Sequence, residues 1–260
     1  MLFSEYDSLS AKLERHLSKA RSVTSISPHI SRPPCPSSNS SSLLSLSDIQ
    51  NRASENEFMN DAEIINKFRE NRFSMISMNI RSLTKHLSEL RHIASKLKPD
   101  IIALQEIWKP HEPFVSIPDY HNILMNVRPP GKTGGGTAIY VKKSLKIKKS
   151  NALNDIKLKK MELTSIIVTS NKYEVLILSL YRPPDCTITD TKDDLDKILS
   201  KIGNQSIVIT GDLNIDYSKH NTLKEMYDQK LLDNNLVQHV RQYTRITSKS
   251  KSSITIQFQT

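Results

Sequence analysis

From residue 73 onward the chain alternates short apolar, β-branched segments with longer amphipathic ones, and this alternation limits the folds open to it. The segments 73–80 (FSMISMNI), 99–108 (PDIIALQEIW) and 206–217 (SIVITGDLNIDY) begin with the apolar character of strands buried on both faces. Between the first two, residues 84–98 place their leucines on one face at helical spacing. Strands and helices that alternate over roughly 190 residues predict a layered α/β fold.

The same criteria predict three more strands and two more helices in this region. The strands are 134–145, 161–170 and 172–184, and the helices are 191–203 and 222–235. The last two strands are close enough in sequence to pair as a hairpin. The first helix is expected to end at Gly203, because glycine is favoured at helix C-caps.

The first 72 residues differ from the rest and form a predicted extension to a domain at 73–260. Residues 22–47 consist mainly of serine and proline, a composition that predicts a flexible linker. Short helices are expected on both sides of it, one starting near Leu9 and one over 48–69. The hydrophobic core is therefore expected in the domain rather than in the extension.

The net charge of +10 is carried by the predicted domain. Basic and acidic residues balance in the first 72 residues, nine against nine, whereas the remainder has 28 against 18. The stretch from Arg128 to Lys160 alone holds ten basic residues and one acid, Asp155. This basic segment suits a phosphate-rich partner such as DNA, and it equally suits a solvated, lysine-rich surface.

Cysteine and hydropathy patterns bear on the compartment. The two cysteines, Cys35 and Cys186, are far apart and lack the spacing of a metal site, so neither a disulfide framework nor a zinc site is expected. No apolar run approaches the roughly 18 residues of a membrane span, and the N-terminus lacks the apolar core of a secretory signal. An intracellular, reducing location is expected.

Four predicted strands end on polar side chains suited to phosphoester chemistry. These residues are Asn79, Glu106, Tyr181, and the pair Asp212 and Asn214. Open α/β sheets bind ligands at the carboxyl ends of their strands. Mg²⁺ takes oxygen ligands, often one or two carboxylates, with phosphate and water completing the shell. The strand ends therefore predict a metal-assisted site.

The residue types indicate a role for each side chain. Glu106 is expected to bind Mg²⁺ (or Mn²⁺), with Asn79 as a neutral oxygen ligand beside it. Asp212 would orient or deprotonate the attacking water, while Asn214 and Tyr181 would donate hydrogen bonds to phosphate oxygens. Purely structural roles remain open, because Asp and Asn suit turns, Glu suits solvent and Tyr suits a core.

Six segments in order carry a family resemblance. They read MNIRSL, PDIIALQEIW, TGGGTAIYVKKSL, LSLYRPP, VITGDLNID and QYTRIT. Together they resemble the endonuclease/exonuclease/phosphatase superfamily, and most closely the apurinic-like endonuclease domain of non-LTR (LINE-type) retrotransposons.

The resemblance implies a four-layer α/β sandwich, with two facing mixed β-sheets flanked by helices. It also implies Mg²⁺-dependent nicking of DNA to leave a 3′ end that primes reverse transcription. By motif match, Asn79 and Glu106 take the metal-side roles and Tyr181 contacts phosphate. Asp212 and Asn214 position the nucleophile, and Thr244 corresponds to a supporting threonine near the site.

The C-terminal segment departs from the family pattern, which continues with Ser-Ser-x-Ile-Asp and ends with Ser-Asp-His. Here the chain reads SKSKSSITIQFQT, so Thr255 stands at the expected aspartate and the final Asp-His pair has no counterpart. A truncated domain with a sheet one strand short is expected. Loss of the carboxylate and the imidazole predicts little or no catalysis.

Three functions are compatible with these features. The first is an impaired Mg²⁺-dependent DNA-nicking endonuclease domain of retroelement origin. The second is a non-catalytic nucleic-acid-binding remnant that keeps the basic surface, and the third is a phosphatase acting on small phosphoesters. A DNA-directed function would imply a nuclear location.

Overall fold

The computed structural model describes the predicted domain and one short piece of the extension. The described residues are 23–25, 73–108, 114–129, 131–150, 153, 155–169, 174–203, 205–215, 220–238, 245–246, 251–252 and 255–259. The predicted N-terminal helices, near Leu9 and over 48–69, lie outside these residues. So does the predicted linker at 22–47, except for β1 (Val23–Ser25), which forms a strand.

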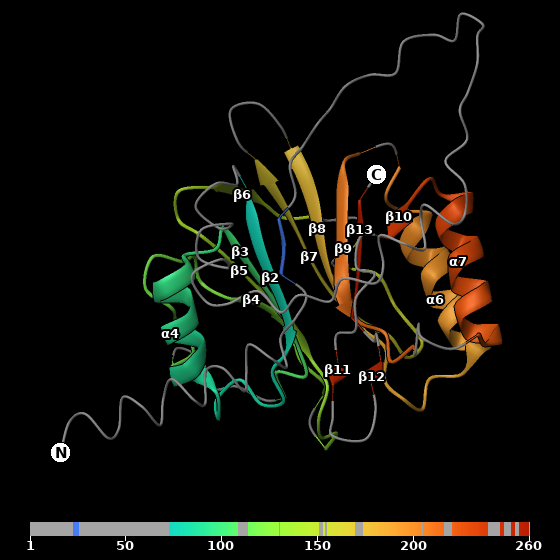
Figure 1. Ribbon diagram of the computed structural model, residues 1–260, viewed down its shortest axis with the longest axis horizontal. Helices are drawn as coiled ribbons and strands as arrows, with labels where there is room; N and C mark the ends of the chain where they lie inside the picture. The colour runs from blue at the N-terminus through green and yellow to red at the C-terminus, as the bar shows by residue number, and fades with distance from the viewer. Residues whose placement is uncertain are drawn as a thin grey trace, which may run out of the picture.

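Two mixed β-sheets form the centre of the molecule (Figure 1). The first sheet has the order β1-β2-β3-β5-β4, with β2 (Ser74–Asn79), β3 (Ile101–Gln105), β5 (Thr137–Val141) and β4 (Leu124–Asn126). The second has the order β10-β13-β9-β8-β7-β6, with β10 (Val237–Gln238), β13 (Thr255–Gln259), β9 (Ile207–Asp212), β8 (Glu174–Tyr181), β7 (Glu162–Thr169) and β6 (Lys146–Lys148). A separate pair joins β11 (Arg245–Ile246) to β12 (Lys251–Ser252).

Strand direction follows from the connections. β2 and β3 are parallel because α4 (Leu87–Leu97) crosses between them, and β8 and β9 are parallel because α6 (Ile188–Leu199) does the same. The predicted hairpin of β7 and β8 is confirmed by an eight-residue antiparallel ladder. β9 has a neighbour on both sides, since β13 pairs with it antiparallel.

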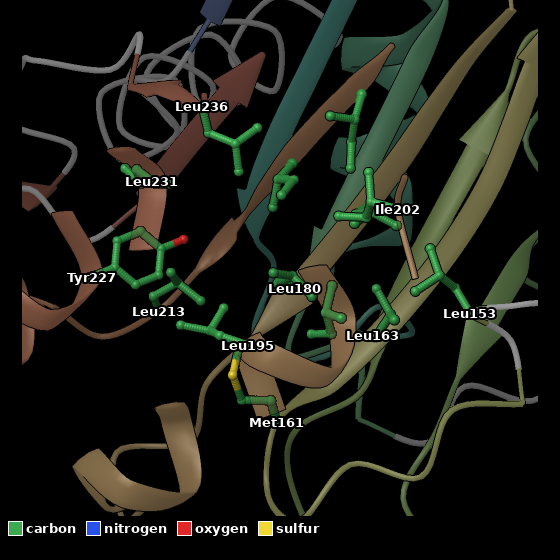
Figure 2. Packing of buried hydrophobic residues seen from close by; sticks show 14 of the residues in the cluster. Leu153, Met161, Leu163, Leu180, Leu195, Ile202, Leu213, Tyr227, Leu231 and Leu236 are labelled. Atoms are coloured by element: carbon green, nitrogen blue, oxygen red, sulfur yellow. The ribbon is translucent and has the colours of Figure 1, made fainter. Parts of the chain in front are cut away.

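Three apolar clusters hold four layers together, which confirms the predicted sandwich. One lies between the sheets and takes residues from both, including Met75, Ile101, Ile177 and Val208. A second packs the first sheet against α4. The third packs the second sheet against α6 and α7 (Thr222–Asp233), and Figure 2 shows Leu195 and Tyr227 of these helices in it. In Figure 1, α4 lies on one side and α6 and α7 on the other.

The helix ends show where local sequence decides the structure. Thr187 caps α6 by accepting a hydrogen bond from the Asp190 amide at 3.0 Å, and Asn221 caps α7 in the same way. The prediction that the first of these helices reaches Gly203 was wrong, because α6 ends at Leu199. Turns follow as far as Ile202, and Gly203 then adopts a left-handed φ of 61°.

Side-chain burial in the described part of the chain fits a protein with an internal core. Within those residues, no helix is both long enough and apolar enough to cross a bilayer. The short strands β4 and β6 were not predicted. Both lie at the outer edges of their sheets, where pairing with β5 and β7 forms them.

Candidate active site

Four of the predicted residues lie at one edge of the packed sheets, here called the site edge. Asn79 ends β2, Glu106 follows β3, Tyr181 ends β8 and Asp212 ends β9. The ladders are level at this edge, because Asn79 pairs with Gln105 in one sheet and Tyr181 pairs with Asp212 in the other. Residues more than 100 positions apart in sequence therefore meet at the carboxyl ends of parallel strands.

A single side-chain amide joins the two sheets at the site edge. Asn79 Nδ2 donates to Glu106 Oε1 at 2.6 Å and to Asp212 Oδ2 at 2.8 Å. These two carboxylate oxygens are therefore at most 5.4 Å apart, the sum of the two distances. Asp212 is buried, whereas Asn79 and Glu106 are half-buried. Two carboxylates this close favour a donor or a cation between them.

The site edge continues the faces on which the two sheets pack. Along β2, β8 and β9 the inward positions read apolar residue, hydroxyl residue, site residue. The three series are Met75, Ser77, Asn79; Ile177, Ser179, Tyr181; and Val208, Thr210, Asp212. Gln105 Nε2 links the hydroxyl layer of both sheets by donating to Ser179 Oγ at 3.0 Å and to Ser77 Oγ at 3.4 Å. A buried polar layer thus underlies the site.

Glu106 reaches this face only because the alternation of β3 breaks. Ile102 and Leu104 pack toward α4, and strict alternation would send Glu106 the same way. Instead its backbone is left-handed, with φ of 54°, which is uncommon for a residue other than glycine. Its carboxylate meets Asn79 and accepts from the Tyr181 hydroxyl at 3.3 Å. A strained backbone therefore directs this side chain to the site.

The Gly-Asp-Leu-Asn sequence after β9 has two structural reasons. A Cβ at Gly211 would overlap the Leu180 carbonyl oxygen of the neighbouring strand, so only glycine fits before Asp212. Asn214 is left-handed, with φ of 50°, and its amide N donates to Asp212 Oδ1 at 3.0 Å. Its Nδ2 donates to the Arg182 carbonyl at 2.8 Å. Asn214 thus fixes the carboxylate of Asp212 and joins this turn to the end of β8.

Tyr181 remains protonated at the pH of ordinary assays. Burial raises the pKa of its phenol well above the usual value, and the charges of Glu106 and Asp212 raise it further. The hydroxyl is therefore a lasting hydrogen-bond donor. It can serve Glu106, as observed, or an anionic phosphate oxygen in its place.

The donor set fits a hard divalent cation. Asn79 Oδ1 is buried and has no hydrogen-bond partner among the described residues. It belongs to the amide that bridges Glu106 and Asp212, so a neutral oxygen and two carboxylates are gathered in one place. The residues that the structure describes contain no cluster of three acidic, histidine or cysteine side chains able to hold a metal. Mg²⁺ needs only one or two carboxylates when phosphate and water complete its shell.

The remaining predicted features are only partly described. Thr244 lies outside the described residues. The backbone register places Thr255 opposite Asp212, at the site edge. Of the histidines, His121 hydrogen-bonds the Leu145 carbonyl and His220 forms an exposed pair with Glu225. Neither of these two imidazoles is used at the site edge.

Several residues that sequence reasoning missed support the site. Arg182, directly after Tyr181, is buried, and its guanidinium donates to Thr191, to Cys186 and to the Leu213 carbonyl. Burial lowers its pKa. These bonds tie the loop after β8 to α6 and to the turn that carries Asp212. The only signal in the sequence was an arginine directly after an apolar strand.

The basic segment is spread over several elements rather than forming one free surface. Five of its ten basic residues form ion pairs with acids in the described part of the chain. These five are Arg128, Lys142, Lys148, Lys159 and Lys160. Lys148 lies on the edge strand β6, where charged side chains disfavour pairing with another sheet. Charge counted along the sequence therefore overstates the cationic surface available to a partner.

A layered fold with acidic and amide groups gathered at strand ends defines a phosphoesterase-like class of protein. The family model described as "Endonuclease/Exonuclease/phosphatase family" matches residues 76–248. This is well over half of the chain, so the protein belongs to that family. It is a nuclease or phosphatase domain by family. Comparison with curated proteins gave no match.

Solved structures confirm the fold. The endonuclease domain of TRAS1, described as a telomere-specific non-LTR retrotransposon, is similar with a TM-score of 0.58 and 15% identity, covering 72% of this chain and 83% of that one. A family protein from Leptotrichia buccalis gives 0.51 and 16%, covering 72% and 87%. A humanized D. rerio TDP2 gives 0.52 and 15%, covering 72% and 82%. At these identities the likeness concerns the fold.

Proposed function

We propose that this protein is a Mg²⁺-dependent, DNA-nicking endonuclease domain of retroelement origin with weak turnover. The observation that carries the proposal is the shared amide of Asn79, which brings Glu106 and Asp212 within one ion-sized distance at the site edge. The fold similarity to a retrotransposon endonuclease domain supports the choice of DNA over other phosphoesters.

The side chains divide the chemistry of phosphodiester hydrolysis. Glu106 and Asn79 would hold the cation, which supplies charge neutralisation at the phosphate when bound. Asp212 orients the attacking water and accepts its proton, and the Asn214 amide keeps this carboxylate in place. The Tyr181 hydroxyl stabilises negative charge on a phosphate oxygen, because its raised pKa keeps it protonated.

Weak turnover follows from what stands beside Asp212. Thr255, a neutral residue, pairs with it across the β9–β13 ladder, where the family pattern has an aspartate. Loss of a group that manages the proton or stabilises transition-state charge typically costs about 100-fold or more in rate. We therefore expect slow nicking rather than none.

A plasmid assay tests this proposal. Supercoiled DNA incubated with the protein and Mg²⁺ should convert slowly to the nicked form, and EDTA should stop the reaction. Glu106→Gln and Asp212→Asn should abolish it, whereas Lys148→Ala, in an exposed pair far from the site edge, should not. Nicking that persists in both site variants would come from a contaminant and would refute the assignment.

A second candidate is a nucleic-acid-binding domain without turnover, favoured by the neutral Thr255. It predicts DNA binding that weakens steeply with salt and no nicking by the wild-type protein. A phosphatase of the same family would instead release phosphate from small phosphomonoesters and leave plasmid intact. A DNA-directed function would place the protein in the nucleus, which imaging of the tagged full chain would test.

A further inference from the structure

The single tryptophan of this protein is exposed beside the candidate site. Trp108 is 40% exposed, whereas most other large apolar side chains of the described domain are buried. It stands two residues after Glu106, the predicted metal ligand, on the same segment beyond β3. Tryptophan has the largest apolar surface of any residue, so its partial exposure at a site is a strong indication of ligand contact.

The backbone is built to hold Trp108 in this position. Its φ is 63°, a left-handed conformation that is costly for a bulky residue. Trp108 N donates to the Gly135 carbonyl at 2.8 Å, and the preceding Ile107 N donates to the Gly136 carbonyl at 3.3 Å. Ile107 is itself buried and anchors the segment in the core. The exposed indole is thus held by a fixed backbone and not by a loose loop.

A cation lies next to the same glycine turn. The Arg128 guanidinium covers Gly135 so closely that a Cβ there would overlap it. Arg128 also lowers the pKa of Tyr181 through its charge, which opposes the effect of burial and shows that it is near the site. An aromatic face, a guanidinium and a phenol donor therefore lie along one edge. This combination matches a nucleotide unit, with a flat base and an anionic phosphate.

We propose that Trp108 is a stacking platform for one unpaired or extruded nucleobase of a DNA strand, next to the phosphate held at the site edge. This rests on the proposed function and specifies how its substrate is held. Base–aromatic stacking contributes about 5- to 150-fold in affinity per base. Arg128 attracts the adjoining phosphate, so the base and the backbone are bound together.

Fluorescence tests the contact directly, because Trp108 is the only tryptophan. The full chain in EDTA, where nicking cannot occur, is titrated with a short single-stranded oligodeoxynucleotide. Stacking should quench the emission, and the same strand with abasic residues should bind without quenching. Equal quenching by both strands, or by neither, would overturn the proposal. So would a mononucleotide that quenches at concentrations as low as the strand does.

Affinity measurements separate this inference from the nicking activity. With a labelled oligonucleotide, Trp108→Ala should bind about 5- to 150-fold more weakly, and its affinity should no longer distinguish normal from abasic strands. Phe114→Ala is the matched control, since Phe114 is a 74% exposed aromatic residue beside α4 and should leave binding unchanged. Strand binding that depends on Trp108 without any nicking would refute the enzyme and keep the platform. Unchanged binding by Trp108→Ala would refute the platform alone.

Discussion

Arg128 and Glu162 form an ion pair that joins the two sheets at the site edge. Arg128 Nε lies 2.5 Å from Glu162 Oε1, and both side chains are mostly shielded from solvent. Arg128 follows β4 of the first sheet, whereas Glu162 opens β7 of the second. The second oxygen of Glu162 accepts a hydrogen bond from the Gly136 amide. The pair therefore holds the glycine turn that positions Trp108.

Glu162→Ala should destabilise the protein more than Arg128→Ala. Removing the carboxylate leaves both the guanidinium and the Gly136 amide without their acceptor, which costs about 1–3 kcal/mol. Removing the arginine loses a partly exposed pair, worth about 1 kcal/mol or less. Urea unfolding measures both. Lys148→Ala is the control and should have no resolvable effect, and equal losses at Arg128 and Glu162 would contradict this assignment.

Asn79→Asp should make the protein dependent on a divalent cation. A third carboxylate beside Glu106 and Asp212 replaces a bridging donor with a like charge, so the melting temperature in EDTA should fall. The extra oxygen charge should bind Mg²⁺ more tightly and should make the rise in melting temperature on adding Mg²⁺ larger than in wild type. A variant that melts like wild type in both conditions would contradict the arrangement.

Asp194 is a buried carboxylate in α6 that fixes the segment leading into β7. It accepts hydrogen bonds from the amides of Lys159, Lys160 and Met161 at 2.7–2.9 Å. Asp194→Ala should cost about 3–5 kcal/mol in the free energy of unfolding, because three amides lose a charged acceptor. Asp194→Asn keeps one acceptor oxygen and should cost less. Asp193→Ala, at an exposed position on the same helix, should cause no measurable change.

Tyr120 should make stability fall in alkaline solution. Burial raises the pKa of its phenol, and the charges of Asp100 and Asp119 raise it further. In the unfolded chain the phenol ionises near pH 10, so its stabilising contribution is complete below that pH and is lost as pH rises toward the folded value. Above pH 10, wild type should lose up to about 1.4 kcal/mol per pH unit more than Tyr120→Phe. Parallel curves for the two proteins would contradict this explanation.

The central elements of the fold could be predicted because their sequences carry strong local patterns. β2, β3, β5, β7, β8 and β9 are apolar runs, and α4 repeats leucines at helical spacing. β4 and β6 were missed because each has three residues, and hydrogen bonding to a neighbour decides them rather than propensity. The end of α6 was misplaced because turns, which local sequence resembles closely, continue the chain as far as Gly203.

The positions of the site residues could be predicted because they end strands, but the groups that support them could not. The roles of Asp194, Arg182 and Glu162 depend on contacts between distant parts of the chain, which no local pattern reveals. One usable signal was overlooked, the order of apolar, hydroxyl and site residue at alternate positions of three strands. The cationic potential of the basic segment was overestimated because its acidic partners lie elsewhere in sequence.

Anomalous scattering from crystals grown with Mn²⁺ tests the central claim most directly. An ion bound by a carboxylate oxygen of Glu106 and by Asn79 Oδ1 should give an anomalous peak at the site edge, and Glu106→Gln crystals should lack it. A wild-type crystal with Mn²⁺ bound elsewhere, or with no peak beside Glu106, would contradict the assignment of these residues to a metal-assisted phosphoesterase site.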